Sequence, residues 1–525
     1  MVIKLTKNKW YKNEFISVCG YFFDENNQLI EHENLLKYFQ QTLNESILRQ
    51  KLIHANGLFA VIINHPKFKA IAIDKTRIYP IYFSTENNKI VVSDNPHCLI
   101  NKKSHIDKKS SIEYKASGAP FEGKTLINNI FQIKPSHYIL FTKEKIEQKP
   151  YYTYLTKEHE LKYSTNAELD IVLKNALTRC IKSIKTRQIV VPLSGGYDSR
   201  LIVCMLKRLN YQNVICYTVG RPNSIEYFYA QKVAKKLNYP HYFIDTTTTE
   251  ITDSSIFKDE DFINYFNFIG NYSNFVWLYE YVAIKWLKNN NLIHSNAVFI
   301  PGHSGDTIAG SHLKKANIKS QQSISYLTNA ILYDSFEYGY CKKLKKNIYN
   351  QFNAEKREGY TIHSIYQNFI IQNRQTHNII NSARIYEFFD YDVRLPLWDD
   401  EVMELFRTIP YPQLENCKFY NEYVTTQLFT QYNVNFIEQN KSTNKSVIII
   451  YKIKNRIKRF LPKIIINIFV KLEDTLGERE LSKPLLKELI NKKYYRNKYD
   501  YTSINEIIKD WYFYKVQKEL FIRKK

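Results

Sequence analysis

The chain has 525 residues, which is too long for one ordinary hydrophobic core and predicts two or three domains. Hydrophobic residues make up 44% and aromatic residues 15%, a composition that excludes wholesale disorder. The formal net charge of +24 would suit a nucleic acid, an anionic membrane or a polyanionic substrate. Because lysine, isoleucine, asparagine and tyrosine are abundant throughout, we attribute this charge to compositional bias and do not expect a nucleic-acid partner.

The cysteines and the hydropathy pattern indicate the cellular compartment in which the protein works. The seven cysteines are scattered without a CxxC pair, which argues against a zinc site and against a disulfide scaffold. The start MVIKLTKNKW has no apolar core of a secretory signal, and no run of 18 apolar residues occurs. We therefore expect a cytoplasmic protein.

Residues 1–155 contain short β-rich segments separated by Asn, Asp, Pro and Gly. These segments are YFFDENNQLI, LFAVIINHPKFKAIAIDK, YPIYF and KIVVSDN, and ENLLKYFQQTL is the main helical candidate among them. The pattern predicts an α+β domain built on an antiparallel sheet.

From residue 156 onward, strands and helices alternate. Strands are predicted over 188–193, 214–220 and 241–245, with helices over 197–209 and 224–237 between them. A further helix over 277–287 and a strand over 297–302 extend the series, and the chain is mostly helical after about residue 315. This alternation predicts a doubly wound parallel sheet, and hence an α/β fold, over residues 156–445. A basic helical extension should follow over 446–525.

The stretch VVPLSGGYDS joins a predicted strand to a predicted helix, and we call its residues 193–199 the phosphate loop. Glycine permits close backbone approach, hydroxyl groups donate hydrogen bonds, and a helix N-terminus carries partial positive charge, so the loop forms an anion cradle. Asp198 would repel a phosphate directly, and we therefore expect it to bind a bridging Mg²⁺. The alternative is a tight turn in which Asp198 only caps the helix. The predicted binding residues are Leu193, Ser194, Gly195, Gly196, Asp198 and Ser199.

LSGGYDS resembles the pyrophosphate loop of N-type ATP pyrophosphatases, and the whole chain resembles the asparagine synthetase family. GLFAVIIN, AIDKTRIYPIYF and GKTLINNIFQIKPSHYIL resemble that family's Ntn-type glutaminase domain. VFIPGHSGDTIAGSH falls where the family has a Gly-Glu-Gly-Ala-Asp-Glu-like loop, and YDVRLPLWDD falls where it has Glu-x-Arg-x-Pro. The resemblance implies cleavage of ATP to AMP and pyrophosphate with ATP and Mg²⁺ bound. It also implies that Gly220, on the adenine side, and Gly302 contribute to nucleotide binding.

Asp306 is the predicted second metal ligand. It follows the strand AVFIP, whose end should face the same crevice as the phosphate loop. Two carboxylates from different strand ends can hold Mg²⁺ on a triphosphate, with waters completing its octahedron. The alternative is a loop aspartate in a glycine-containing turn.

The first departure from the family concerns glutamine hydrolysis. A glutaminase of this type has cysteine as its first residue after removal of Met, and the free α-amine serves as its base. Here Val2 follows Met1, and the first cysteine is Cys19. We therefore expect ammonia, another amine or a partner glutaminase to supply the nitrogen.

The second departure is His303, which replaces the Glu of Gly-Glu-Gly, and the third is Asp392, which falls on the Glu of Glu-x-Arg-x-Pro. β-Lactam synthetases have a Tyr–Glu pair there, and lasso-peptide cyclases resemble this loop more closely with Gly-His-Gly-Gly-Asp. We predict that His303 and Asp392 form a His–carboxylate dyad that takes a proton from the attacking amine. The alternative is a structural histidine bonded to loop backbone.

Two features of the C-terminal part concern the site and the packing of the chain. For the site, the resemblance implies a lysine that stabilises negative charge near the α-phosphate, and NFIEQNKSTNKS makes Lys441 the first choice and Lys445 the second. The following run VIIIYKIKNRIKRFLPKIIINIFVKL mixes apolar and basic residues. It should pack on its own domain, with a peripheral contact at the inner face of a membrane as the alternative.

We expect an ATP-dependent ligase that adenylates a carboxylate and releases the acyl group to ammonia or another amine. The carboxylate could belong to a small molecule, a sugar acid of a surface polysaccharide or a peptide, by analogy with the family. A tRNA-modifying ATP pyrophosphatase and a non-catalytic homologue are the alternatives. The sequence leaves the substrate and the oligomeric state open.

Overall fold

The computed structural model describes residues 1–86, 89–142, 145–248, 260–335, 342–436 and 504–524. Its N-terminal part contains two sheets, in agreement with the predicted antiparallel domain. The smaller sheet has the order β1-β8-β7-β9, and the larger has the order β11-β10-β6-β5-β3-β2, with β4 paired to β3. Neighbours are antiparallel except for the parallel pair β1–β8.

The strands of the smaller sheet are β1 (Val2–Lys4), β7 (Tyr82–Glu86), β8 (Lys89–Ser93) and β9 (Phe131–Gln132). Those of the larger sheet are β2 (Tyr11–Lys12), β3 (Ile16–Phe23), β4 (Leu29–Glu31), β5 (Asn56–His65), β6 (Phe68–Ile73), β10 (His137–Phe141) and β11 (Ile146–Pro150). The main helices here are α1 (Asn34–Phe39), α2 (Glu45–His54) and α3 (Lys108–Ser117).

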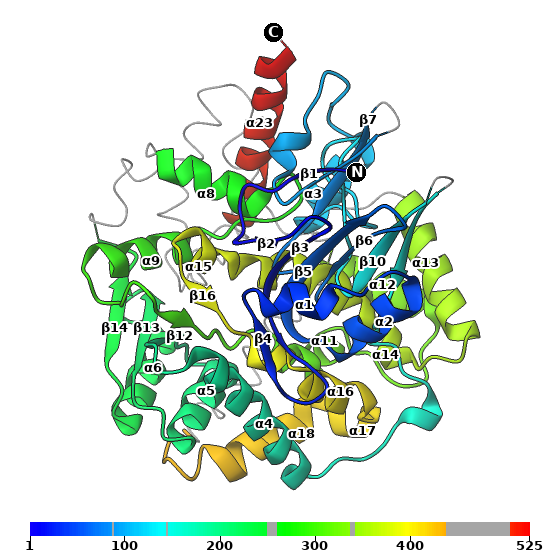
Figure 1. Cartoon of the computed structure of the whole chain (residues 1–525). Helices are drawn as coiled ribbons and strands as arrows, with labels where there is room; N and C mark the ends of the chain where they lie inside the picture. The colour runs from blue at the N-terminus through cyan, green and yellow to red at the C-terminus, as the bar shows by residue number, and fades with distance from the viewer. Residues whose placement is uncertain (87–88, 143–144, 249–259, 336–341, 437–503, 525) are drawn as a thin grey trace, which may run out of the picture.

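Both faces of the larger sheet are covered, because its side chains alternate between two apolar layers. Val18 and Val61 pack with Leu35 of α1 and Leu48 of α2 on one face. Residues one step along the same strands, including Ala60, face the smaller sheet in a second cluster. Figure 1 shows α1 and α2 lying across this sheet.

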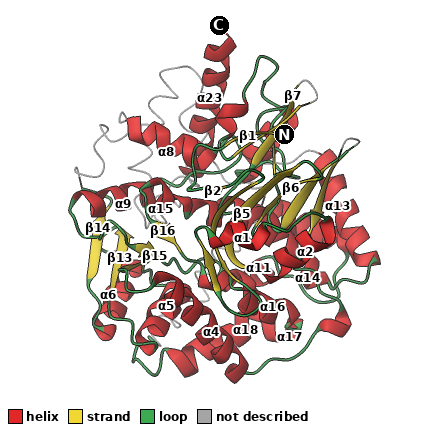
Figure 2. Cartoon of the chain, viewed as in Figure 1, coloured by secondary structure: helices red, strands yellow, loops and turns green. Residues whose placement is uncertain are grey.

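The second part of the chain is built on a five-stranded parallel sheet with the order β14-β13-β12-β15-β16. Its strands are β12 (Ile189–Pro192), β13 (Val214–Gly220), β14 (His241–Asp245), β15 (Val298–Phe299) and β16 (Asp392–Val393). Helices α4 (Asn166–Ile184), α5 (Tyr197–Arg208) and α6 (Ile225–Leu237) lie on one side of it, and α9 (Tyr279–Asn289) and α15 (Arg384–Phe388) lie on the other (Figures 1 and 2). The predicted α/β fold with a doubly wound sheet is therefore confirmed.

The remaining described elements are mainly helical. They are α8 (Glu260–Gly270), α10 (Gly305–Ile308), α11 (Ser311–Lys315), α12 (Ile324–Ser335), α13 (Lys342–Arg357), α14 (Ile362–Phe369), the π-helical segment Ile370–Ile380, α16 (Asp400–Thr408), α17 (Tyr411–Leu414), α18 (Lys418–Tyr423), the π-helical segment Val424–Leu428 and α23 (Ile504–Lys524). Within these described ranges, no helix is long and apolar enough to cross a membrane.

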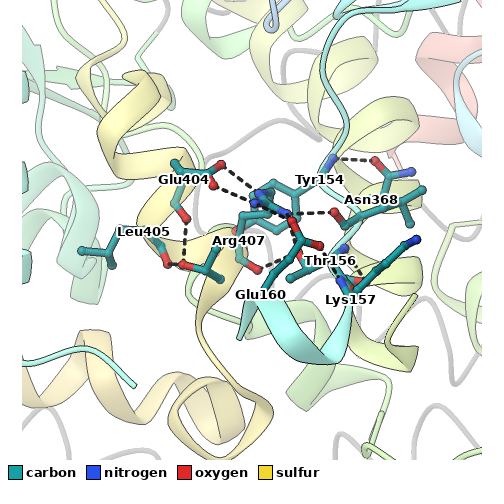
Figure 3. A network of polar contacts seen from close by, with 11 residues as sticks. Tyr154, Thr156, Lys157, Glu160, Asn368, Glu404, Leu405 and Arg407 are labelled. Atoms are coloured by element: carbon teal, nitrogen blue, oxygen red, sulfur yellow. Dashed lines mark hydrogen bonds and ion pairs between the residues drawn. The ribbon is translucent and has the colours of Figure 1, made fainter. Parts of the chain in front are cut away.

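Polar contacts fix the segment that joins the two parts (Figure 3). The Tyr154 amide donates to Asn368 of α14 at 3.1 Å, and the Thr156 hydroxyl donates to the Arg407 carbonyl of α16 at 2.8 Å. The Arg407 guanidinium also forms ion pairs with Glu404 at 2.6 Å and with Glu160 at 3.2 Å. The joining segment is thus bound to two helices of the second part.

The C-terminal helix α23 contacts both parts, and in the N-terminal part the Lys509 ammonium group donates to the Lys115 carbonyl of α3 at 3.1 Å. The ring of Trp511 lies 4.6 Å from that of Phe266 in α8, and the Tyr512 hydroxyl accepts from the Tyr272 amide at 2.9 Å. The apolar and basic run over 447–472, for which a membrane contact was the alternative, lies outside the described residues. The domain boundaries at 155 and 445 stay predictions.

Candidate active site

The phosphate loop begins where β12 ends and leads directly into α5. Gly196 occupies the N-cap position of α5, and no side chain caps the helix there. Within the loop, the Ser194 amide donates to the Ser199 hydroxyl at 3.0 Å, and the Gly196 amide donates to the Ser194 hydroxyl at 3.1 Å. The Gly195 amide donates to a carboxylate oxygen of Glu226, in α6, at 2.6 Å. A negatively charged oxygen therefore already lies against this loop.

The loop after β15 contacts the phosphate loop so closely that positions 302 and 305 require glycine. A Cβ atom on Gly302 would lie 2.4 Å from the Ser199 amide nitrogen, and one on Gly305 would lie 2.8 Å from the carboxylate of Asp198. Only glycine leaves room for such an approach. The ends of β12 and β15 are thereby joined into one wall.

Asp198 and Asp306 lie together at this junction. The Asp306 amide donates to Asp198 Oδ2 at 2.9 Å, and the Tyr420 hydroxyl of α18 donates to Asp198 Oδ1 at 2.8 Å. Burial, and next the charge of Asp306, raise the pKa of Asp198 to about 7. Two such carboxylates repel one another until a cation binds, and oxygen ligands are what Mg²⁺ prefers. The pair therefore fits a magnesium ion.

A cavity of about 610 Å³ opens beside these residues. Of the predicted residues, Leu193, Ser194, Gly196, Asp198, Ser199, Gly302, His303 and Asp306 line it. Gly195 instead bonds to Glu226, and Gly220 ends β13 with φ at +150° beside Asp245 of β14. Lys441 and Lys445 lie outside the described residues.

The predicted dyad of His303 and Asp392 is wrong. His303 follows the C-terminal end of β15, whereas Asp392 opens β16 and pairs in register with Val298. His303 lies five positions after Val298 in the direction in which β15 ends, a span of at most roughly 15 Å for an extended chain. Asp392 also forms an ion pair with Arg187 at 2.6 Å, with its side chain 53% exposed. The register of the parallel sheet thus places the two side chains at opposite strand ends.

His303 itself remains at the site without the carboxylate partner that was expected. Its Nδ1 atom is enclosed and makes no hydrogen bond to any residue that the structure describes, and desolvation lowers the pKa of its imidazole to about 4. The ring is therefore neutral at physiological pH. A neutral imidazole with an open nitrogen can accept a proton.

Three further residues of the cavity were missed by the sequence reasoning. Glu226 and Tyr420 bond to the phosphate loop and to Asp198, and Glu280 lies buried in the cavity wall. Glu280 offered a signal, because it is the single acid in the apolar helical pattern WLYEYVAIKWL. Glu226 and Tyr420 offered none, since their contacts join segments far apart in the sequence.

Cys19 of the N-terminal part lies in the middle of β3, opposite Ala60 of β5, with 1% of its surface exposed. Burial raises the pKa of its thiol well above the ordinary value. Its nitrogen belongs to a peptide bond, so it cannot act as the α-amine that the glutaminase mechanism needs. Cys19 is therefore a structural residue.

Comparison with solved structures gives weak likenesses. An NH3-dependent NAD synthetase from Campylobacter jejuni is 14% identical with a TM-score of 0.22, and the match covers 37% of this chain and 97% of that one. A glutamine phosphoribosylpyrophosphate amidotransferase from B. subtilis is 9% identical with a TM-score of 0.19, covering 45% of this chain and 72% of that one. No curated protein matches the sequence.

Family models give a clearer result. The model described as glutamine amidotransferase domain matches residues 32–152, which include most of the two N-terminal sheets. The model described as asparagine synthase matches residues 168–432, which include the parallel sheet and every described residue that lines the cavity. Because the second match spans just over half of the 525 residues, the chain belongs to the asparagine synthase family.

Proposed function

We propose that the chain uses ATP to adenylate a carboxylate, releases pyrophosphate, and transfers the acyl group to ammonia or another amine. The observation that carries the proposal is the close junction of the phosphate loop with Asp306, beside a cavity large enough for further ligands. A carboxylate is a poor electrophile, and converting one of its oxygens into an AMP leaving group makes acyl transfer feasible. The family match supports an ATP-dependent amide ligase.

Each side chain has a role in this proposal. The phosphate loop would hold the phosphates through its amides and the positive end of α5. Asp198 and Asp306 would hold Mg²⁺, which when bound neutralises charge on the phosphates. His303 would accept a proton from the nitrogen, and Lys441 stays a prediction for the stabilising cation.

The nitrogen source in the proposal is free ammonia, an organic amine or ammonia from a partner glutaminase. The burial of Cys19 supports an external source, since a thiol enclosed in a strand cannot attack glutamine. The carboxylate would belong to a small molecule, a sugar acid or a peptide. Surface-polysaccharide modification and peptide modification are the two settings that we propose.

Carboxylate-dependent exchange of labelled pyrophosphate into ATP tests the proposal without requiring an amine. The panel contains L-aspartate, D-glucuronate and an aspartate-containing peptide. We expect exchange with one class, its loss in Asp198→Asn and Asp306→Asn, and its retention in Asp392→Asn, because Asp392 lies at the other strand end. ATP cleavage to ADP, or no exchange with any carboxylate, would contradict the proposal.

A further inference from the structure

Glu280 is a buried acid that the proposed reaction has not yet used. It is the second residue of α9, only 7% of its surface is exposed, and it lines the same cavity as His303. Among the described residues, neither its enclosed Oε2 atom nor Nδ1 of His303 has a hydrogen-bond partner. Leaving buried polar atoms unpaired destabilises the fold, so such atoms at a cavity point to a ligand that pairs with them.

The charge of the cavity wall indicates what kind of ligand that is. The described lining contains four acids, namely Asp198, Glu226, Glu280 and Asp306, and no lysine or arginine. A magnesium ion would compensate Asp198 and Asp306, and Glu226 bonds to the Gly195 amide at 2.6 Å. Glu280 alone is left without a positive counterpart among the described residues. Burial raises the pKa of Glu280 to about 8, so at neutral pH its carboxyl ionises only beside a positive charge. The complement of its carboxylate form is therefore a cation.

The surroundings of Glu280 favour an organic cation. Tyr217 and Tyr279 line the cavity beside it, and aromatic rings attract ammonium groups while they contact alkyl carbons. A free ammonium ion would use the charge of Glu280 but leave the apolar part of this wall uncovered. An alkylammonium group uses both.

We propose that Glu280 and His303 form the nucleophile subsite and that the nucleophile is an organic primary amine, which binds as its ammonium ion. This inference rests on the proposed function and names its nitrogen donor. Binding of the ammonium ion releases to solvent the proton that the buried carboxyl holds at neutral pH. Glu280 then holds the ammonium group as a carboxylate and takes its first proton. The neutral nitrogen then attacks the acyl carbon, the C–N bond forms, and the C–O bond to AMP breaks with its electron pair leaving on the phosphate oxygen.

The second proton passes from nitrogen to His303, so amide and AMP form with one proton on each side chain. The properties of both groups agree with this order. A pKa of about 8 favours the protonated form of Glu280 whenever no cation is beside it, and so again once the amine has given up its proton. The pKa of His303, at about 4, keeps the imidazole neutral until then. The pKa values of the two groups are thus shifted in opposite directions, as they are in pairs of residues that act as acid and base.

Thermal unfolding of the full chain with Mg²⁺ and α,β-methylene-ATP tests the subsite, because the nucleotide fills the other end of the cavity. The probes are 50 mM ethylammonium chloride, ammonium chloride, potassium chloride and sodium acetate at equal ionic strength. We expect ethylammonium to raise the midpoint by about 1 °C or more over potassium, and ammonium to raise it less. Acetate should not raise it.

Glu280→Gln should lose the ethylammonium shift and keep the nucleotide shift, which also shows that the variant is folded. Glu358→Gln is the matched control and should keep both shifts, because Glu358 is an exposed acid that directly follows α13. If Glu280→Gln does not fold, Glu280→Asp replaces it, and withdrawal of the carboxylate by one methylene group should at least halve the shift.

Three results would overturn the subsite: no ethylammonium shift in the native protein, an equal shift with acetate, or a full shift in the Glu280 variant. An ammonium shift as large as that of ethylammonium would overturn the organic amine. Pyrophosphate exchange needs no amine, so exchange without an ethylammonium shift refutes the subsite alone. Absence of exchange refutes the proposed function.

Discussion

Replacing Gly302 with alanine should separate the two loops that form the candidate nucleotide site. The added Cβ would lie 2.4 Å from the Ser199 amide nitrogen and 2.6 Å from the Asp198 carbonyl carbon. Both are backbone atoms at the start of α5, which cannot rotate aside. Ordinary contact begins at 3.4 Å, so the loops must move apart by about 1 Å.

The expected cost follows from this displacement. Overpacking of this kind destabilises a fold by about 1–3 kcal/mol. A misplacement of about 1 Å at reacting groups lowers rates by roughly 100-fold. We therefore expect Gly302→Ala to weaken Mg·ATP binding at least about tenfold and to lower pyrophosphate exchange about 100-fold.

Calorimetric titration with Mg·ATP and the exchange assay measure the two quantities. Gly359→Ala is the control, because its φ of +92° makes alanine strained there while no other atom lies within 4 Å of the new Cβ. It should lose stability, by about 1 kcal/mol, with ATP affinity unchanged. If Gly302→Ala bound ATP within twofold of the native protein, the close contact between the loops would not be what positions the site.

Three further predictions concern buried polar groups. Arg179→Met should destabilise the chain by about 3–5 kcal/mol in urea unfolding. It leaves Asp399, whose side chain is 8% exposed, without its ion-pair partner at 2.7 Å; unchanged stability would contradict this. Glu280→Gln should become more stable than the native protein as pH rises. The folded pKa of about 8 exceeds the ordinary value of 4.5, so ionisation opposes folding increasingly between those values, by up to about 5 kcal/mol; parallel stability curves from pH 5 to 9 would refute it. Tyr420→Phe removes a 2.8 Å hydrogen bond to Asp198, the proposed metal ligand that Tyr420 holds in place. The Mg²⁺ concentration for half-maximal exchange should rise about two- to tenfold. An unchanged Mg²⁺ requirement would rule out this positioning role of Tyr420.

The sequence by itself determined the local elements of the parallel domain. Strands β13 and β14 occupy the predicted ranges, and α5 begins at Tyr197 as expected. Hydrophobic periodicity, turn residues and helix caps act between near neighbours, so a linear pattern is sufficient to place them. The phosphate loop could be located for the same reason, since strand, glycines and helix are contiguous.

Only the tertiary structure decided which distant side chains meet. Asp392 occupies the Glu position of the family's Glu-x-Arg-x-Pro motif, yet its register opposite Val298 removes it from the cavity, and it pairs with Arg187. Glu280 joins His303 at the cavity because α9 packs against the sheet, and no local signal fixes which face of a helix lies beside a strand end. Register and helix packing depend on pairings across long stretches of chain, and these are set by burial of the whole core.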